Sequence, residues 1–311
     1  MGAYKQRLDT FSAGNLPTLD EVVLGALDLF CDTTVPEIDF SRFKRPLVVG
    51  SGNAAVTGRL LFAGVDAVFA DESSYIEKLD AVGDIDGAVL ISSSGSKHAL
   101  PIAAELKRRN VDTVLCTNNA DAPAKSMISS DKIFVFPKNR EPYTYNTSTY
   151  MGMILSKTKE DPESILSFIE DYVAPIVPTS LTDHGAYYFI FPEHYNEMRE
   201  MIATKFNELF GPQVMGRIFT AEQTKHAKTV VPMEGELFVS FGEENTMFGE
   251  PENRIDIPLP DRANYAAMMA ISYYVVGCLQ KQLPPYYMNR ISGYVKETSQ
   301  IFGSTINIIV E

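Results

Sequence analysis

Residues 88–98 constrain the fold most, because an apolar run ends there abruptly in small polar residues. The run Ala88–Ile91 is followed by Ser92–Gly95, and the segment after that has apolar residues at helical spacing, namely Leu100, Ala103 and Leu106. An apolar run of this length, bounded by serine and glycine, is typical of a buried parallel strand. The stretch therefore predicts a strand, a tight turn and a helix in succession.

The same alternation of strand and helix recurs along the chain. In the first half, strands are predicted at 47–49, 67–70, 87–91, 112–116 and 133–136. The order repeats in the second half, with strands at 186–191, 214–219 and 236–241 and helices at 195–210, 221–227 and 261–282. Strands that alternate with helices are joined by right-handed crossovers into parallel sheets. The predicted fold class is therefore α/β, with two similar doubly wound halves in tandem.

Composition shifts divide the chain into three parts. Residues 1–45 are predicted to be helical and exposed, and polar or proline-rich breaks occur at 157–162 and 175–183. We therefore predict an N-terminal helical segment at 1–45, a first half at 46–175, and a second half at 176–311 that includes a C-terminal tail.

Charge and cysteine content exclude several classes of function. The formal net charge of −13 disfavours a nucleic acid or an anionic membrane as partner. Cys31, Cys116 and Cys278 are widely spaced in apolar contexts, which indicates buried thiols in a reducing compartment. We expect a cytoplasmic protein, because the N-terminus carries no apolar signal region and no run approaches a membrane span. No cofactor or metal is expected, because no cluster of ligands has metal spacing.

Two turns are candidates for binding an anion. The turn Ser92–Gly95 presents hydroxyls and backbone N–H groups at a helix N-terminus, although helix capping alone is an alternative explanation. Neither a Walker loop nor a dinucleotide-binding loop is present, so a compact sugar phosphate is favoured over a nucleotide. A second turn, Gly50–Ala54, offers Ser51 and Asn53, or else only a glycine needed for close contact between strand and helix. Both turns follow strands, and open α/β sheets bind ligands at the carboxyl ends of their strands.

The first of these turns resembles the phosphate loop of the SIS (sugar isomerase) domain family, which reads approximately I-S-x-S-G-x-T-x-E. Ile91–Gly95 matches its first half, and Val114–Asn118 resembles the end of the next strand, whereas Lys97 and Ala99 replace the family's Thr and Glu. The resemblance implies two tandem SIS-type halves, each a flavodoxin-like three-layer sandwich. It also implies that the phosphate of a sugar is bound by Ser51, Asn53, Ser92, Ser93, Ser94, Gly95, Lys97 and Thr147. Thr147 belongs to a hydroxyl-rich segment at 141–149 before a long helix, where simple N-capping is the alternative.

Three residues of the second half are the catalytic candidates. Glu208, His226 and Lys296 resemble as a set the isomerase part of glucosamine-fructose-6-phosphate aminotransferase and the bifunctional phosphoglucose/phosphomannose isomerases. Moving a proton between C1 and C2 of a sugar phosphate needs a carboxylate base, here Glu208. A cation beside the developing oxyanion would be Lys296, and an acid/base for ring opening would be His226. In the related enzymes this histidine commonly comes from a neighbouring subunit, so a homodimer is expected.

The sequence leaves several functions open. The favoured one is an aldose-ketose isomerase that acts through an enediolate on a hexose or hexosamine 6-phosphate. An alternative is a fructosamine-phosphate deglycase, or amine transfer at the same carbon. A non-catalytic phosphosugar-binding regulator is a further alternative, and it gains support from the replacements at Lys97 and Ala99. The last alternative is an inactive structural subunit.

Overall fold

The computed structural model describes residues 2–39 and 41–311, which form two compact units. Unit 1 contains the chain up to Asp32, Asn139–Ser148 and Glu160–Glu311, and unit 2 contains Thr33–Lys138 and Thr149–Lys159. Each unit is assembled from separate stretches, whereas the boundaries proposed from the sequence at residues 45 and 175 follow the chain in order. Met1 and Phe40, both in the segment 1–45, lie outside the described residues.

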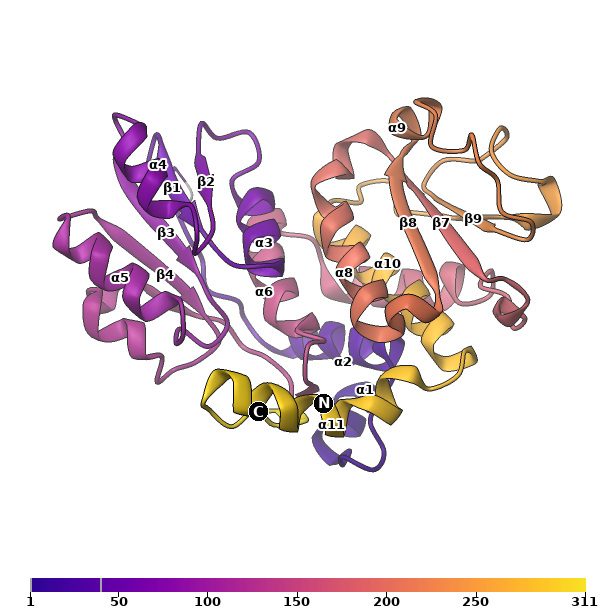
Figure 1. Ribbon diagram of the computed structural model, residues 1–311, viewed down its shortest axis with the longest axis horizontal. Helices are drawn as coiled ribbons and strands as arrows, with labels where there is room; N and C mark the ends of the chain where they lie inside the picture. The colour runs from indigo at the N-terminus through magenta and orange to yellow at the C-terminus, as the bar shows by residue number, and fades with distance from the viewer. Residues whose placement is uncertain (1, 40) are drawn as a thin grey trace. The chain divides into compact units, whose positions relative to one another are not determined.

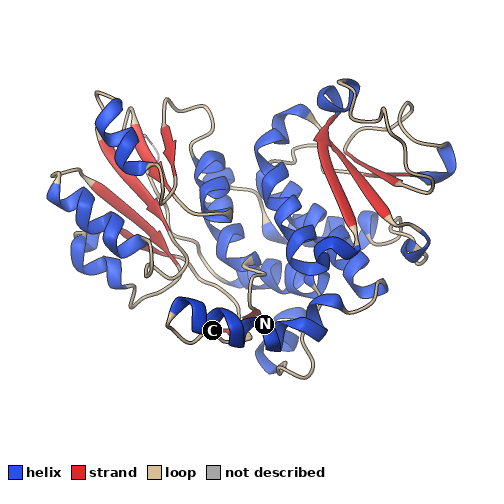
Figure 2. Cartoon of the chain, in the orientation of Figure 1, coloured by secondary structure: helices blue, strands red, loops and turns tan. Residues whose placement is uncertain are grey.

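The secondary structure alternates as expected (Figures 1 and 2). The helices are α1 (Ala3–Thr10), α2 (Leu19–Asp32), α3 (Asn53–Leu61), α4 (Tyr75–Ala81), α5 (Ala99–Arg108), α6 (Thr147–Thr158), α7 (Pro162–Phe168), α8 (Arg199–Phe210), α9 (Ala221–Lys225), α10 (Tyr265–Gln282) and α11 (Tyr286–Phe302). The strands are β1 (Pro46–Val49), β2 (Val68–Ala70), β3 (Gly87–Ile91), β4 (Thr113–Thr117), β5 (Ile133–Val135), β6 (Glu141–Pro142), β7 (Ala186–Phe191), β8 (Met215–Thr220), β9 (Leu237–Phe241), β10 (Arg254–Ile257) and β11 (Ile309–Val310).

Unit 2 is built on a five-stranded sheet in the order β2-β1-β3-β4-β5, with every pair parallel. Strand β1 is buried on both faces. Leu47 and Val49 belong to a core cluster that includes residues of α5, while Val48 faces α3, since a Cβ added to Gly58 would lie 2.8 Å from its Cγ1. Figure 1 shows α3 and α5 on opposite sides of the sheet, as right-handed crossovers require. The five strands predicted for the first half are confirmed.

Unit 1 contains a four-stranded parallel sheet in the order β10-β9-β7-β8. Aromatic residues of β7 pack on both faces. Phe189 contacts Phe206 of α8 with ring centroids 5.2 Å apart, and Tyr188 stacks on Phe238 of β9 at 4.9 Å on the other face. Three of these strands were predicted, and β10 was missed. The α/β fold with two parallel-sheet halves is therefore confirmed.

The N-terminal segment differs from its prediction, because α2 is buried in unit 1 rather than exposed. It packs against α10 so closely that a Cβ added to Gly277 would lie 1.9 Å from the backbone nitrogen of Asp20. The N–H of Leu19 donates to Gln280 Oε1 at 2.8 Å. The physical reason is that α2 is apolar on most of its circumference, and such a helix is buried in a core.

Across residues 2–39 and 41–311, none of the helices is both long enough and apolar enough to cross a membrane.

Candidate functional site

The serine-rich loop after β3 is fixed by the end of β4 in unit 2. The carbonyl oxygen of Ser93 accepts hydrogen bonds from Thr117 Oγ1 at 2.9 Å and from the N–H of Asn118 at 3.0 Å. The carbonyl oxygen of Ser94 accepts from Asn119 Nδ2 at 3.0 Å. These hydrogen bonds fix the backbone of the loop against the end of β4.

Gly95 gives this loop its shape. Its φ of +59° lies in the left-handed region, where only glycine is free of strain. A Cβ at this position would lie 2.4 Å from the Cβ of Ala122. Its N–H donates to Ser92 Oγ at 3.1 Å, and its carbonyl accepts from the N–H of Ala124 at 3.0 Å. The loop is therefore held rigidly before any ligand arrives.

The remaining polar groups of the loop precede helix α5. The hydroxyls of Ser94 and Ser96 share a hydrogen bond of 2.7 Å. Ser94 and Lys97 are exposed, and Ser92 and Ser93 are half-buried. Hydroxyls and a lysine just before a helix N-terminus suit an anion, because the first N–H groups of the helix point in the same direction.

The turn after β1 adjoins this loop, since β1 and β3 are neighbours in the sheet. The Ser51 hydroxyl donates to Glu72 Oε2 at 2.5 Å, so a carboxylate already engages it. Asn53 is 9% exposed and Asn118 is 7% exposed, and the side-chain oxygen of each has no hydrogen-bond partner among the described residues.

The same turn also serves close contact between strand and helix. A Cβ on Gly50 would lie 2.6 Å from the backbone of Ala54. The glycine is therefore required by contact between β1 and α3, whatever the turn binds.

Thr147 begins α6 and is fully buried. Glu141 caps this helix, because its carboxylate accepts the N–H groups of Thr147 and Ser148, both at 2.7 Å, and the Ser148 hydroxyl. Burial raises the pKa of Glu141 in spite of these donors. The Thr147 hydroxyl does not cap the helix and has no hydrogen-bond partner among the residues described.

Glu208 lies near the end of α8 in unit 1, next to a lysine that the sequence analysis did not single out. Lys205 is fully buried, and its Nζ donates to Glu208 Oε2 at 2.5 Å and to the carbonyl oxygen of Thr144 at 2.6 Å. The Glu208 side chain is 25% exposed. Burial, Tyr294 and the Glu208 charge together raise the pKa of Tyr143. Glu208 is thus a reachable carboxylate held in place by a cation.

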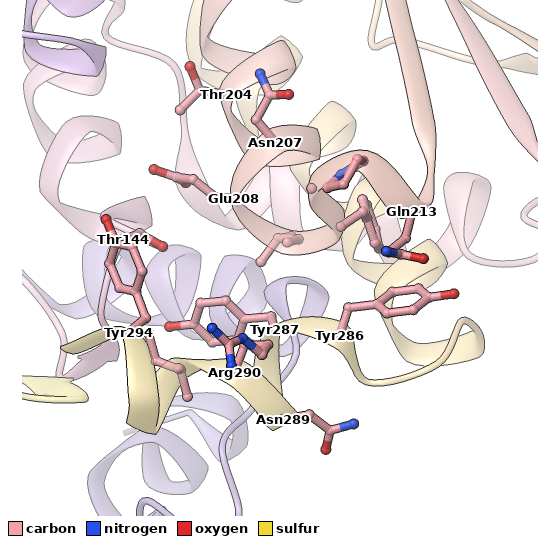
Figure 3. A pocket seen from close by; sticks show the side chains of 15 residues that line it. Thr144, Thr204, Asn207, Glu208, Gln213, Tyr286, Tyr287, Asn289, Arg290 and Tyr294 are labelled. Carbon is pink, nitrogen blue, oxygen red and sulfur yellow. The ribbon is translucent and has the colours of Figure 1, made fainter. Parts of the chain in front are cut away.

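Glu208 is part of the wall of a pocket of about 690 Å³ within unit 1 (Figure 3). The other lining residues come from the turn at Thr144, from α8 and the residues after it, and from α11: Thr144, Thr204, Asn207, Leu209, Phe210, Gly211, Pro212, Gln213, Tyr286, Tyr287, Asn289, Arg290, Ile291 and Tyr294. In Figure 3, Glu208 projects from α8 on one side, and Arg290 and Tyr287 project from α11 on the other.

The other two catalytic candidates are on the surface. His226 follows the last residue of α9 and is exposed. Lys296 lies on α11 and is exposed as well. Neither belongs to the residues that line the pocket at Glu208. Within unit 1, Glu208 therefore lines one pocket with other residues of α11, and the roles of His226 and Lys296 stay predictions.

The carboxyl edge of the second sheet has a different character. A cavity of about 170 Å³ there is lined by residues that include Lys225, Glu243 and Glu244. The Ser240 hydroxyl donates to Asp256. Carboxylates at this edge disfavour a phosphate. The described part of the chain contains no group of three or more His, Cys, Asp or Glu that could hold a metal ion.

Two features of the site could not be found by motif. Lys205 stands three residues before Glu208, a spacing that allows an ion pair on a helix, but its complete burial depends on tertiary contacts. Asn119 follows the predicted strand at 112–116, and nothing local indicates that its side chain holds the loop of the preceding strand.

Comparisons with known proteins identify the fold. No protein-family model matches the chain, and no curated protein sequence matches it either. Among solved structures, tagatose-6-phosphate ketose/aldose isomerase from Escherichia coli superimposes with a TM-score of 0.60 and 13% identity, over 87% of this chain and 95% of that one. The C-terminal domain of glucosamine-fructose-6-phosphate aminotransferase from Francisella tularensis gives 0.59 and 15%, over 88% and 94%.

A third neighbour, glucosamine-6-phosphate deaminase from Thermotoga maritima, gives a TM-score of 0.57 with 13% identity, over 86% of this chain and 93% of that one. The chain thus has the α/β fold of the SIS-type phosphosugar proteins, as the resemblance in its sequence predicted. The three names describe three different reactions on sugar 6-phosphates. This fold therefore accommodates more than one reaction, and residues rather than architecture must distinguish them.

Proposed function

We propose that this chain is a sugar-phosphate aldose-ketose isomerase that acts on a hexose or hexosamine 6-phosphate. The observation that carries the proposal is Glu208, a partly exposed carboxylate fixed by the buried Lys205 in the wall of a pocket. A base that must take a proton from carbon and return it one atom away needs to be both accessible and held in position.

The proposed reaction assigns a task to each candidate residue. The residues Ser92–Gly95 and Asn53 bind the phosphate and adjoining hydroxyls of the sugar. Glu208 removes the proton from C2, the electrons of that C–H bond form the C1–C2 double bond, and the C1 carbonyl electrons move onto O1 to give an enediolate. The carboxylic acid then returns the proton to C1 while the proton on O2 transfers to O1, which leaves the C2 carbonyl of the ketose. Lys296 stabilises the enediolate oxyanion, and His226 opens the sugar ring.

Ligand binding and isotope exchange test this function directly. A panel of hexose and hexosamine 6-phosphates is expected to raise the thermal midpoint, since a ligand at one hundred times its Kd stabilises the folded state by about 2.7 kcal/mol. The ligands that bind are then incubated in deuterium oxide, and NMR should show deuterium at C1 of the ketose and, after the reverse reaction, at C2 of the recovered aldose. If no phosphosugar raises the midpoint, the phosphate loop does not have this role and the proposal fails.

A phosphosugar-binding regulator is the second candidate. It is favoured by Lys97 and Ala99, which stand where the SIS phosphate loop has Thr and Glu. The same panel separates the two, because a regulator would be stabilised by a phosphosugar without exchanging its C2 proton. A deglycase or an amine-transfer enzyme would instead release or move nitrogen from a fructosamine phosphate, which an ammonia assay detects.

We also propose that the chain forms a homodimer through the surface that follows His226. Val230, Val231 and Met233 are 72%, 80% and 46% exposed. Met233 lies next to Gly185, because a Cβ added to Gly185 would be 3.0 Å from Met233 Cε. Ala186, the residue after Gly185, pairs with Met215, which is 57% exposed. Exposed apolar residues gathered in one place are typical of a protein interface. In a dimer formed through this surface, His226 of one copy would lie close to the other copy.

Changing Val231 to glutamate tests the dimer. The variant is expected to shift from dimer to monomer in light scattering after size-exclusion chromatography, because a charge cannot be buried unpaired in an interface. Isomerisation should fall along with it. Ile76→Glu, on an exposed residue of α4, is the control and should leave both unchanged. A wild-type protein that elutes as a monomer at micromolar concentration would contradict the proposal.

A further inference from the structure

We propose that Thr144 is a positioning residue for Glu208, and that strand β11 holds the turn at Thr144 in place. This inference rests on the proposed function, because it explains how the base of that reaction is fixed. Thr144, Glu208 and β11 all belong to unit 1.

The backbone at Thr144 has an unusual conformation. Its φ is +75°, and Asn146, two residues later, has a φ of +49°. A β-branched residue rarely adopts a positive φ, because its Cβ then lies too close to the following carbonyl oxygen. Strain of this kind persists only where the surrounding structure holds it, and it is concentrated at functional sites. Contacts on both sides of the turn must therefore maintain the conformation.

The carbonyl group of Thr144 is bound to a buried ammonium group. Its oxygen accepts a hydrogen bond from Lys205 Nζ at 2.6 Å, and the same Nζ donates to Glu208 Oε2 at 2.5 Å. The Lys205 side chain is 0% exposed, so water does not replace either acceptor. Because one ammonium group joins them, a shift of the Thr144 carbonyl moves Lys205 and, with it, the Glu208 carboxylate. Thr144 and Glu208 both line the pocket of unit 1 (Figure 3).

Contacts from β11 and α11 hold the residue before Thr144. The N–H of Tyr143 donates to the carbonyl oxygen of Ile308 at 2.7 Å, and the antiparallel pairing of β11 with β6 begins at the next residue. The carbonyl oxygen of Tyr143 accepts from the Tyr287 hydroxyl at 2.5 Å. Both backbone groups of Tyr143 are therefore engaged, which fixes the chain as it enters the turn.

Strand β11 also supports the other side of the turn. The Glu141 carboxylate accepts the N–H groups of Thr147 and Ser148, both at 2.7 Å, and so fixes the start of α6. Val310 of β11 lies opposite Glu141 in the two-stranded sheet. Both residues of β11 are half-buried, so the strand adds little to the core. Its contribution is therefore to the backbone around Thr144.

Two substitutions at Thr144 separate the backbone conformation from the side chain. Thr144→Pro fixes φ near −65° and moves the carbonyl, so kcat should fall by about tenfold to a hundredfold while the Kd for the phosphosugar stays close to the wild-type value. Thr144→Gly adopts the positive φ without strain and should retain the wild-type kcat. Turnover is measured with the phosphosugar that the wild-type protein isomerises, and Kd is measured by calorimetry.

Deleting residues 308–311 removes β11 and leaves Thr144 unchanged. The same loss of kcat is expected, again with a Kd close to that of the wild type. Ile308→Ala is the matched control, because it keeps the carbonyl oxygen that accepts the Tyr143 N–H, and it should retain kcat. Thermal unfolding shows which variants are folded at the assay temperature. A purely structural role would lower the thermal midpoint without lowering the kcat of the folded protein.

Chemical labelling of lysines gives a readout that needs no turnover. Acetylation by N-hydroxysuccinimide acetate, followed by mass spectrometry, reports how accessible each lysine amine is. Lys205 should resist acetylation in the wild type and react about tenfold faster in Thr144→Pro and in the deletion variant, because the contacts that hold it open locally. Lys281, whose side chain is 62% exposed, should react equally in every variant.

The outcomes separate this inference from the proposed function. A folded Thr144→Pro protein with the wild-type kcat would overturn the role of Thr144, and a deletion variant with the wild-type kcat would overturn that of β11. Equal losses of turnover and affinity, or unchanged acetylation of Lys205, would also contradict the inference. If the wild-type protein isomerises no phosphosugar, the proposed function fails by itself. Acetylation of Lys205 then still decides whether Thr144 and β11 fix the pair of Lys205 and Glu208.

Discussion

Replacing Glu208 with glutamine is expected to lower kcat for isomerisation by about 10²–10⁴-fold while leaving the Kd for the phosphosugar within a few-fold. The amide has the size of the carboxylate and can still accept the hydrogen bond from Lys205, so the pocket keeps its shape. It cannot take a proton from carbon. Stopped-flow or coupled assays measure kcat, calorimetry measures Kd, and NMR should show that deuterium no longer enters C2.

A matched control separates loss of the base from loss of charge on the helix. Glu200 lies on α8 as well and does not line the pocket. Glu200→Gln should retain the wild-type kcat. If Glu208→Gln isomerises at the wild-type rate, the base is another residue and the proposed mechanism is wrong. If it loses binding and turnover equally, Glu208 contributes to affinity rather than to proton transfer.

Much of the fold could be predicted because its sheets are buried on both faces. Leu47, Val48 and Val49 contact helices on alternate sides of the sheet, so every residue of β1 is apolar. An amphipathic helix or a surface strand would instead alternate apolar and polar residues. Strand β10 was missed because Arg254–Ile257 is short and half-exposed, with charged residues in alternate positions. The exposure of α2 was predicted wrongly because its burial depends on α10, which is distant in sequence and packs against it.

The candidate site could be predicted from the sequence where it depends on neighbouring residues in the chain, but not where it depends on tertiary contacts. The loop at Ser92–Gly95 is a contiguous motif, and its glycine has the left-handed conformation that such a turn needs. Lys205 is different, because an isolated lysine is expected in solvent and only its contacts with Thr144 and Glu208 explain its burial. Arg290 lines one pocket with the tyrosines one turn away and with residues of α8, which is distant in sequence.

Replacing Gly95 with alanine is expected to weaken phosphosugar binding by about a hundredfold or more, because the phosphate loop must move. The new Cβ would lie 2.4 Å from the Cβ of Ala122, at a φ of +59° that alanine rarely adopts. If the shift removes two hydrogen bonds to the charged phosphate, each is worth about 1.5–3 kcal/mol. Calorimetric titration with the phosphosugar that most raises the thermal midpoint measures the change in Kd.

Gly64 provides the control, because it shares the backbone conformation without the collision. Its φ is +80°, and a Cβ there would meet nothing within 4 Å. Gly64→Ala should therefore lose folding stability through backbone strain alone, by about 1 kcal/mol, while its Kd stays at the wild-type value. Thermal unfolding of both variants shows whether each remains folded at the titration temperature. A folded Gly95→Ala protein with wild-type affinity would mean that the phosphate is bound elsewhere, because the added carbon requires this loop or Ala122 to shift.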